Sequence, residues 1–172
     1  MFKLIGTITI LLTTGCLGVL KGQQYEHRIR DLKSLEMIFL ELLSDIRFGK
    51  ITMAESFARI SQNVPAPFDR FLKNICGELK WKRGRSFEVI FSEEVSQCLV
   101  TSELIPKDLD KLKEVGRSID GSDRETQIHV LETYLRELKK EREMLEKKAP
   151  EQKKICQMLG VTGGAFLLIL LL

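Results

Sequence analysis

The sequence closes with Ile155-Cys-Gln-Met-Leu-Gly-Val-Thr-Gly-Gly-Ala-Phe-Leu-Leu-Ile-Leu-Leu-Leu172, a run that contains no charged residue. Gln157 and Thr162 are its only polar side chains. As an α-helix at about 1.5 Å per residue, the run would reach about 27 Å, close to the ~30 Å hydrocarbon layer of a bilayer. It therefore predicts a C-terminal transmembrane helix over residues 155–172.

A second uncharged apolar run covers residues 4–20, and it predicts an N-terminal transmembrane helix over residues 1–21. One alternative is a lipoprotein signal, because Thr13-Thr-Gly-Cys16 resembles the site that precedes a lipidated cysteine. Against it, a threonine replaces the usual leucine three residues before Cys16, and the chain stays apolar beyond that cysteine. We therefore favour an uncleaved helix, and the alternative is a lipid-anchored helical protein that has lost residues 1–15.

Cationic residues are concentrated directly after the first predicted span and directly before the second. The region between the spans, residues 22–154, is predicted to be cytoplasmic, because loops rich in lysine and arginine stay on that side of a membrane. Lys3 alone precedes the first span, and nothing follows the second. The localisation predicted from this distribution is the cell membrane. The cations are Lys21, Arg28, Arg30 and Lys33 after the first span, and Lys139, Lys140, Arg142, Lys147, Lys148, Lys153 and Lys154 before the second.

Composition excludes some classes of function. The formal net charge of +3 is too small to indicate a nucleic-acid partner. The basic segment 80–85 (Lys-Trp-Lys-Arg-Gly-Arg) is better explained by the preference of helix C-termini for cations. The four cysteines show no C-x-x-C spacing, which favours free thiols in a reducing compartment over disulfides or a zinc site.

Apolar residues at helical spacing begin just after the first predicted span. They recur at intervals of three and four residues, which is typical of one buried helix face, and Gly49 then ends the helix. These positions are Leu32, Leu35, Phe39, Leu42 and Ile46. A new helix is predicted directly afterwards, because Thr52 and Glu55 form a capping box. It carries Phe57, Ile60 and Val64 and stops at Pro65.

Three more helices follow between this point and Ile119. One carries the apolar residues from Phe68 to Leu79, the next is capped by Ser86, and Pro106 suits the first turn of the third. Gly121 then predicts a stop, and Ser122 with Glu125 predicts a capping box for a last helix. Its apolar positions are Ile128, Leu131, Leu135, Leu138 and Leu145, with the charged Arg142 at the remaining position of the stripe.

No stretch alternates between apolar and polar residues at a period of two, so no sheet is expected. The predicted fold class is all-α: an antiparallel bundle of about six helices between an N-terminal and a C-terminal transmembrane helix. The predicted domains are residues 1–21, 22–154 and 155–172.

Catalytic motifs are absent from the sequence. It contains no phosphate-binding P-loop, no G-x-S-x-G and no H-E-x-x-H. His27 and His129 stand beside charged or polar residues, where a histidine is more often exposed than catalytic. Many carboxylates fall at helix starts or in i,i+4 pairs such as Glu132 with Arg136, which support helices. We expect no enzyme activity, no cofactor and no metal.

Two G-x-x-x-G motifs lie at the predicted spans. They are Gly18 to Gly22 and Gly160 to Gly164, and such spacing lets helices approach closely. Small residues are also common in transmembrane helices for other reasons. The spans could therefore pack on each other or on a neighbour, and a homo-oligomer is one expectation. A related alternative is a coiled-coil scaffold in which the first and last apolar stripes drive dimerisation.

With these residues in view, the chain resembles the stage III sporulation protein AB family of endospore-forming bacteria. The resemblance covers nearly the whole length, including the opening Met-x-Lys-Leu-Ile-Gly and Ile46-Arg-Phe-Gly49. Its most specific part is Val115 to Gln127, where Gly116, Ser122, Asp123 and Gln127 match the family pattern. The second glycine of that pattern falls on Asp120, and Gly121 stands next to it.

The resemblance implies a membrane component of a complex that links mother cell and forespore. The family is similar to the cytoplasmic helical domains of platform proteins in type II secretion and type IV pilus machines. The implied partners are a secretion-type ATPase similar to stage III sporulation protein AA and other stage III sporulation membrane proteins. The turn is our candidate contact surface, and the alternative is that these residues serve helix packing and capping. They are Gly116, Asp120, Gly121, Ser122, Asp123, Arg124 and Gln127.

Overall fold

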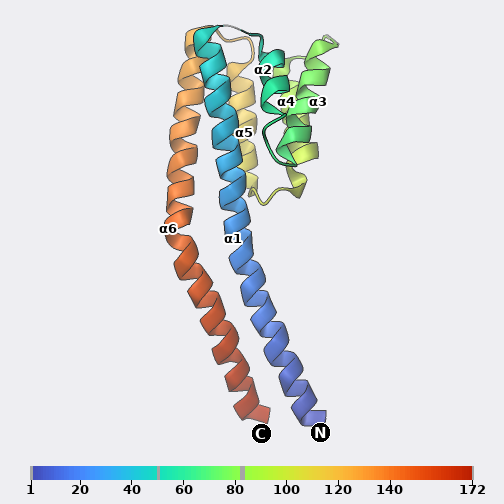
Figure 1. Cartoon of the computed structure of the whole chain (residues 1–172), viewed down its shortest axis with the longest axis vertical. Coiled ribbons are helices and arrows are strands. Elements are labelled where there is room, and N and C mark those ends of the chain that lie inside the picture. Colours follow the sequence, from blue (N-terminus) through green and yellow to red (C-terminus); the bar gives the residue numbers. More distant parts are fainter. Residues whose placement is uncertain (1, 50, 82–83, 172) are drawn as a thin grey trace. The chain divides into compact units, whose positions relative to one another are not determined.

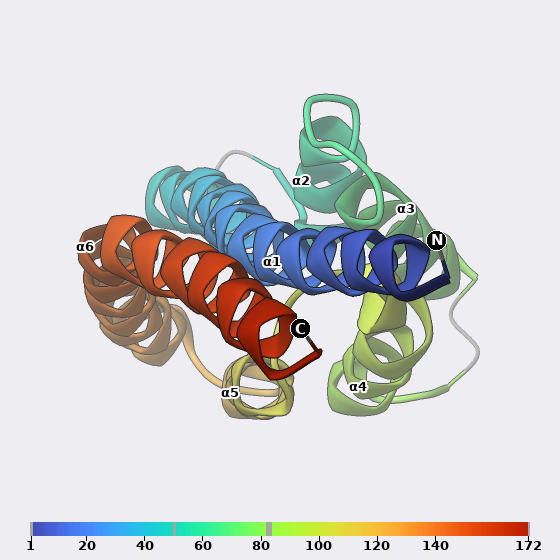
Figure 2. The same cartoon turned by 90° about the horizontal axis from the view of Figure 1, so that it is seen from below.

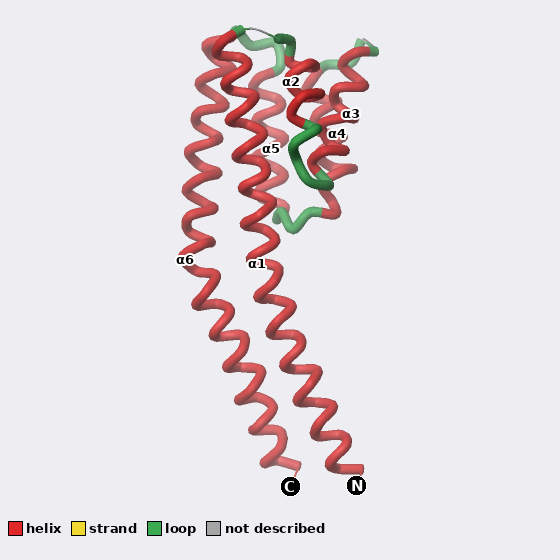
Figure 3. Tube along the Cα trace, in the orientation of Figure 1, coloured by secondary structure: helices red, strands yellow, loops and turns green. Residues whose placement is uncertain are grey.

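A computed structural model describes the backbone of residues 2–49, 51–81 and 84–171. It describes the side chains of residues 23–49, 51–81, 84–150 and 158. The chain divides into two compact units, residues 30–142 and residues 1–29 with 143–172. Within the described backbone there are helices and no strand, so the predicted all-helical class is confirmed (Figures 1 and 3).

Six α-helices and one short 3₁₀ helix make up the described chain. In the unit of residues 30–142, α2 to α5 follow one another in sequence order around the bundle (Figure 2). The helices are α1 (Phe2–Phe48), α2 (Met53–Ile60), α3 (Phe68–Lys80), α4 (Phe87–Cys98), η1 (Leu99–Thr101), α5 (Pro106–Ile119) and α6 (Arg124–Leu171).

Local signals set most of these boundaries, as predicted. Thr52 and Glu55 form the capping box of α2, with the Glu55 backbone N–H donating to the Thr52 hydroxyl at 3.3 Å. Ser86 accepts from the backbone N–H of Val89 at the start of α4, and Pro106 opens α5. Gly49 has a φ of 60°, which lets the chain turn sharply after α1.

The core of residues 30–142 lies between the apolar faces of the helices. The Phe39 ring meets the Tyr134 ring edge-on, with centroids 4.9 Å apart, and Phe71 meets Phe91 in the same way at 5.3 Å. The Phe39 contact joins α1 to α6 within one chain. The stripe residues Leu32, Leu35 and Leu42 of α1 and Leu131, Leu135 and Leu138 of α6 are buried as well. The largest fully buried side chains are Phe39, Phe57, Phe68, Phe71, Phe91, Leu32, Leu35, Ile38, Leu42, Ile60, Leu72 and Ile75.

Two local predictions were wrong. Val64 is buried but lies beyond the end of α2 at Ile60, because the chain already turns there. Glu132 does not pair with Arg136. Its carboxylate accepts from Arg47 on α1, and Arg136 donates to the Thr133 hydroxyl at 3.0 Å. The neighbouring helix offers Glu132 a guanidinium that the i,i+4 rule cannot foresee.

Apart from Met158, the two predicted membrane spans, with Gly18, Gly22, Gly160 and Gly164, lie outside the residues whose side chains are described. Among the described residues, no helix combines the length and the apolar character that crossing a membrane requires. The spans and the three-domain division stay predictions.

Candidate contact surface at the turn between α5 and α6

The turn between α5 and α6 lies at the end of the bundle where α1 ends. We call this the distal end, and the ends of α1, α3 and α5 and the starts of α2, α4 and α6 lie there (Figure 1). The opposite end carries the connections 61–67 and 99–105. Six of the seven candidate residues, Asp120 to Gln127, lie in or next to this turn, and the seventh lies one helical turn inside α5.

Gly116 is buried in α5 against α4. A Cβ at this position would lie 2.4 Å from Cδ1 of Phe91, far inside van der Waals contact. Glycine therefore allows α4 and α5 to approach at this point, with the Phe91 ring filling the space. Since it is buried, Gly116 offers no surface to a partner, and its role in the fold is packing.

Asp120 stabilises the start of a different helix. Its Oδ2 accepts from the backbone N–H of Glu88 in the first turn of α4, at 3.1 Å. The next residue, Gly121, has a φ of 65° and supplies the left-handed conformation that reverses the chain. The turn glycine of this chain thus stands one position after the family's second glycine, and the aspartate in that glycine's place caps α4.

The predicted capping box of Ser122 and Glu125 was wrong, because α6 begins at Arg124 and its cap is Asp123. Asp123 accepts from the backbone N–H groups of Glu125 (3.2 Å) and Thr126 (3.4 Å). Hydrogen bonds from the Thr126 side chain and backbone hold the pKa of Asp123 below its usual value. The Ser122 hydroxyl instead donates to the carbonyl of Ile119 at the end of α5 (3.1 Å).

Arg124 and Gln127 tie the turn to its surroundings. The Arg124 guanidinium donates to the carbonyls of Ile46 (2.8 Å) and Arg47 in the last turn of α1. The Gln127 amide donates to the carbonyls of Ile119 (3.1 Å) and Ser122 (3.2 Å). Most polar groups of the motif therefore join helices, while Gly121, Asp123 and Arg124 remain exposed to solvent.

An open pocket of about 310 Å³ adjoins this turn. It lies where the start of α2, the end of α3 and the start of α4 meet the turn, and its lining is mostly apolar. Two strongly exposed aromatic side chains lie at the same end, Phe48 (66% exposed) and Trp81 (75%). Sequence reasoning missed both as surface features, although a tryptophan within a basic segment was the available signal. The lining residues are Thr52, Met53, Ala54, Leu79, Phe87, Ile119, Asp120, Gly121 and Gln127.

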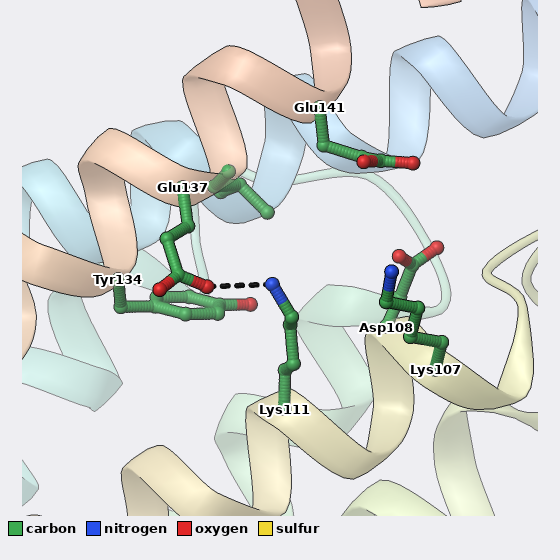
Figure 4. A pocket seen from close by; sticks show the side chains of 7 residues that line it. Lys107, Asp108, Lys111, Tyr134, Glu137 and Glu141 are labelled. Atoms are coloured by element: carbon green, nitrogen blue, oxygen red, sulfur yellow. Dashed lines mark hydrogen bonds and ion pairs between the residues drawn. The ribbon is translucent and has the colours of Figure 1, made fainter.

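A smaller cavity of about 20 Å³ lies between α5 and α6 (Figure 4). Lys111 forms an ion pair with Glu137 across it (2.5 Å), and the Tyr134 hydroxyl points toward this pair. Burial raises the pKa of the Tyr134 phenol, and the Asp108 and Glu137 charges add to the effect, so the phenol stays protonated at neutral pH. The cavity holds about one water molecule, which is too small for a substrate.

His27 and His129 are exposed, as expected. Across the part of the chain that the structure describes, no three His, Cys, Asp or Glu side chains are grouped to hold a metal ion. Cys76 and Cys98 are free thiols, and Cys16 and Cys156 lie outside the described side chains.

The fold and the turn define an all-helical bundle protein in which a short motif fastens the ends of three helices. Residues 3–172 match the family model of stage III sporulation protein AB, and the chain belongs to this family. It is thus a sporulation-related protein, in a family of structural components rather than a known enzyme family.

A solved structure titled "Stage III sporulation protein AB (SpoIIIAB)" is similar, with a TM-score of 0.67 and 17% sequence identity. The likeness covers 72% of this chain and 96% of the other, and at this identity it shows the fold. No curated protein sequence matches the chain.

Proposed function

We propose that this protein is a non-enzymatic membrane platform subunit of a secretion-like complex between mother cell and forespore. Residues 1–21 and 155–172 are its transmembrane helices, and residues 22–154 form a cytoplasmic bundle on the mother-cell side. The bundle engages a secretion-type motor ATPase similar to stage III sporulation protein AA, and the spans contact other membrane proteins of the complex. Membership of the stage III sporulation protein AB family supports this proposal.

The observation that carries the ATPase contact is the construction of the distal end. Side chains of the turn cap α1, α4 and α6, so this surface is held in one conformation before any partner arrives. A preorganised surface loses little conformational entropy on binding. Phe48 and Trp81 add two exposed aromatic side chains to this surface. Aromatic side chains contribute much of the binding energy of protein interfaces.

Binding of the ATPase tests this surface. Charge reversal at Asp123 or Arg124 would disturb the fold as well as the surface, because both side chains hold helix ends. Trp81→Ser and Phe48→Ser remove exposed aromatic groups instead, and we expect each to weaken binding at least tenfold in a titration with the purified ATPase. Val100→Ser is the matched control, since Val100 is 70% exposed at the opposite end. Unchanged binding by both aromatic variants would remove the distal end from consideration.

The membrane arrangement has its own tests. Protease added to intact cells should leave residues 22–154 undigested if the bundle is cytoplasmic. Digestion of that region would invert the topology and exclude contact with a cytoplasmic motor. The mass of the purified protein separates an uncleaved N-terminal span from the lipid-anchored alternative, because processing at Cys16 would delete residues 1–15 and add acyl chains.

A further inference from the structure

Three Lys-Lys pairs occur in the middle part of α6. They are Lys139-Lys140, Lys147-Lys148 and Lys153-Lys154, and the last pair directly precedes the proposed span 155–172. The structure describes the side chains of the first two pairs, and all four lysines are exposed.

Positive charge is concentrated beside the proposed span. Residues 147–154 contain four lysines and one glutamate, which gives a net charge of +3. The preceding eight residues, 139–146, contain three cations and three glutamates and are neutral overall. On the other helix, residues 21–28 carry two cations and one glutamate. The approach of α6 to the proposed span is therefore the more strongly charged of the two.

Lys140 and Lys147, one from each of the first two pairs, lie on one face of α6. Lys140 and Lys147 are seven residues apart, which brings them to the same face, and Lys154 continues this spacing. Leu138 and Leu145 have the same spacing about half a turn away, and both are buried. Lys140 and Lys147 thus lie opposite the packed side of α6, where lysine stems are free to extend.

We infer that residues 147–154 bind the headgroups of anionic phospholipids in the cytoplasmic leaflet. This inference rests on the proposed membrane topology and adds the chemical class of lipid to it. Clusters of four or more lysines immediately cytoplasmic to a span are typical of anionic lipid recognition, with an affinity gain of about fivefold per cation near the surface. The attraction decays over a Debye length of about 8 Å at physiological salt.

Because the attraction decays with distance, the three lysine pairs should differ in their effect on lipid binding according to their distance from the proposed span, and each pair serves as a control for the others. At about 1.5 Å per residue, Lys154, Lys148 and Lys140 are about 2, 10 and 22 Å along a helix from Ile155. Replacing each pair by glutamine removes the same two charges from the same helix. Neutralising the pair at 153–154 should therefore have the largest effect, that at 147–148 a smaller one, and that at 139–140 none.

The experiment uses the full chain in nanodiscs of phosphatidylcholine and phosphatidylglycerol at three to one, with phosphatidylcholine discs as reference. Native mass spectrometry measures the enrichment of phosphatidylglycerol among the lipids that stay bound. We expect a loss of about tenfold for K153Q/K154Q, a loss of about threefold for K147Q/K148Q, and no change for K139Q/K140Q. Raising the salt to 0.5 M should reduce the wild-type enrichment.

Equal enrichment in all four proteins would overturn the lipid inference, and so would equal losses in the three variants. A protein that enters nanodiscs normally but shows no preference for phosphatidylglycerol refutes the lipid inference alone. A protein that fails to enter nanodiscs of either composition refutes the membrane topology on which the inference rests.

Discussion

Arg124, the first residue of α6, donates a hydrogen bond from Nε to the carbonyl oxygen of Ile46 in the last turn of α1, at 2.8 Å. Its Nη2 donates to the carbonyl of Arg47. The last carbonyls of a helix have no partner within the helix, so one guanidinium closes the end of α1. Two of the segments that carry the family resemblance, Ile46 to Gly49 and Val115 to Gln127, are therefore joined in one structural element.

Arg124→Gln should destabilise the bundle by about 1 kcal/mol, because the shorter side chain leaves the α1 carbonyls without their cap. Urea unfolding followed by circular dichroism measures the change. Arg136→Gln is the control, since Arg136 is exposed and donates to Thr133 within its own helix, so its effect should stay within about 0.5 kcal/mol. Equal stability of the two variants would show that the Arg124 contact contributes little.

Gly116→Ala should destabilise the protein by about 1–3 kcal/mol, because the new methyl group would overlap the Phe91 ring. Gly77→Ala in α3 is the matched control. A Cβ at Gly77 meets nothing within 4 Å, so alanine there should stabilise the helix by up to about 1 kcal/mol. The same urea titration compares both. A neutral Gly116→Ala would mean that α4 and α5 can separate without cost.

Local structure was predictable because its causes are local. The capping box at Thr52, the cap at Ser86 and the stop at Gly121 each involve residues within a few positions, and the structure confirms them. The error at Ser122 is of the same kind. Ser122 and Asp123 are adjacent residues that both cap helices well, and sequence alone did not decide which of them begins α6.

Contacts between helices were not predictable from spacing. Asp120 caps α4 and Arg124 caps α1, although each was considered only as part of its own turn. Arg142 stands as a charged residue on an apolar stripe of α6, but its partner Glu36 lies on α1, more than a hundred positions earlier. Such pairs follow from how the helices pack, which a single sequence does not specify.

Asp45 should make the bundle sensitive to acid. Burial on its own would raise the pKa of Asp45, but hydrogen bonds from Ser56 and Arg59 outweigh it and lower the pKa below the model-peptide value of 3.8. A lowered folded-state pKa gives stability that is present above pH 3.8 and is lost as the pH falls through the folded value. Asp45→Asn should therefore be less stable than wild type at pH 7.

The difference between Asp45→Asn and wild type should shrink toward zero near pH 2, where the wild-type carboxyl is also protonated. Thermal melts of the two proteins at pH 7, 4 and 2 measure it. Comparing the two removes the contribution of the other carboxylates. A constant difference across this range would show that Asp45 acts through packing rather than through its charge.

Cys98 should react slowly with thiol reagents. Burial, with the neighbouring Glu94 carboxylate, raises the pKa of the Cys98 thiol to about 11. At pH 7 the reactive thiolate form of Cys98 should then be about a hundredfold scarcer than for a thiol with a pKa of 9.0. Glu94→Gln removes the negative charge and should speed alkylation by iodoacetamide, measured on the Cys98 peptide by mass spectrometry. An unchanged rate would leave burial as the whole cause.

The ion pair of Glu36 and Arg142 is the one charged contact we expect to be replaceable. Arg142 Nε donates to the Glu36 carboxylate at 2.8 Å, and the side chains of Arg142 and Glu36 are 16% and 20% exposed. Removing one partner of a largely buried pair leaves the other charge without compensation, so Arg142→Leu should cost about 1–2 kcal/mol after allowance for the exposed part. The double variant Glu36→Leu/Arg142→Leu removes both charges, of which Arg142 stands on the otherwise apolar stripe of α6, and should recover most of that loss. A double-mutant cycle in urea measures the coupling. If the double variant were as unstable as the sum of the single ones, the pair would matter for reasons other than compensation of charge, such as the shape of the two side chains in the packing of α1 against α6.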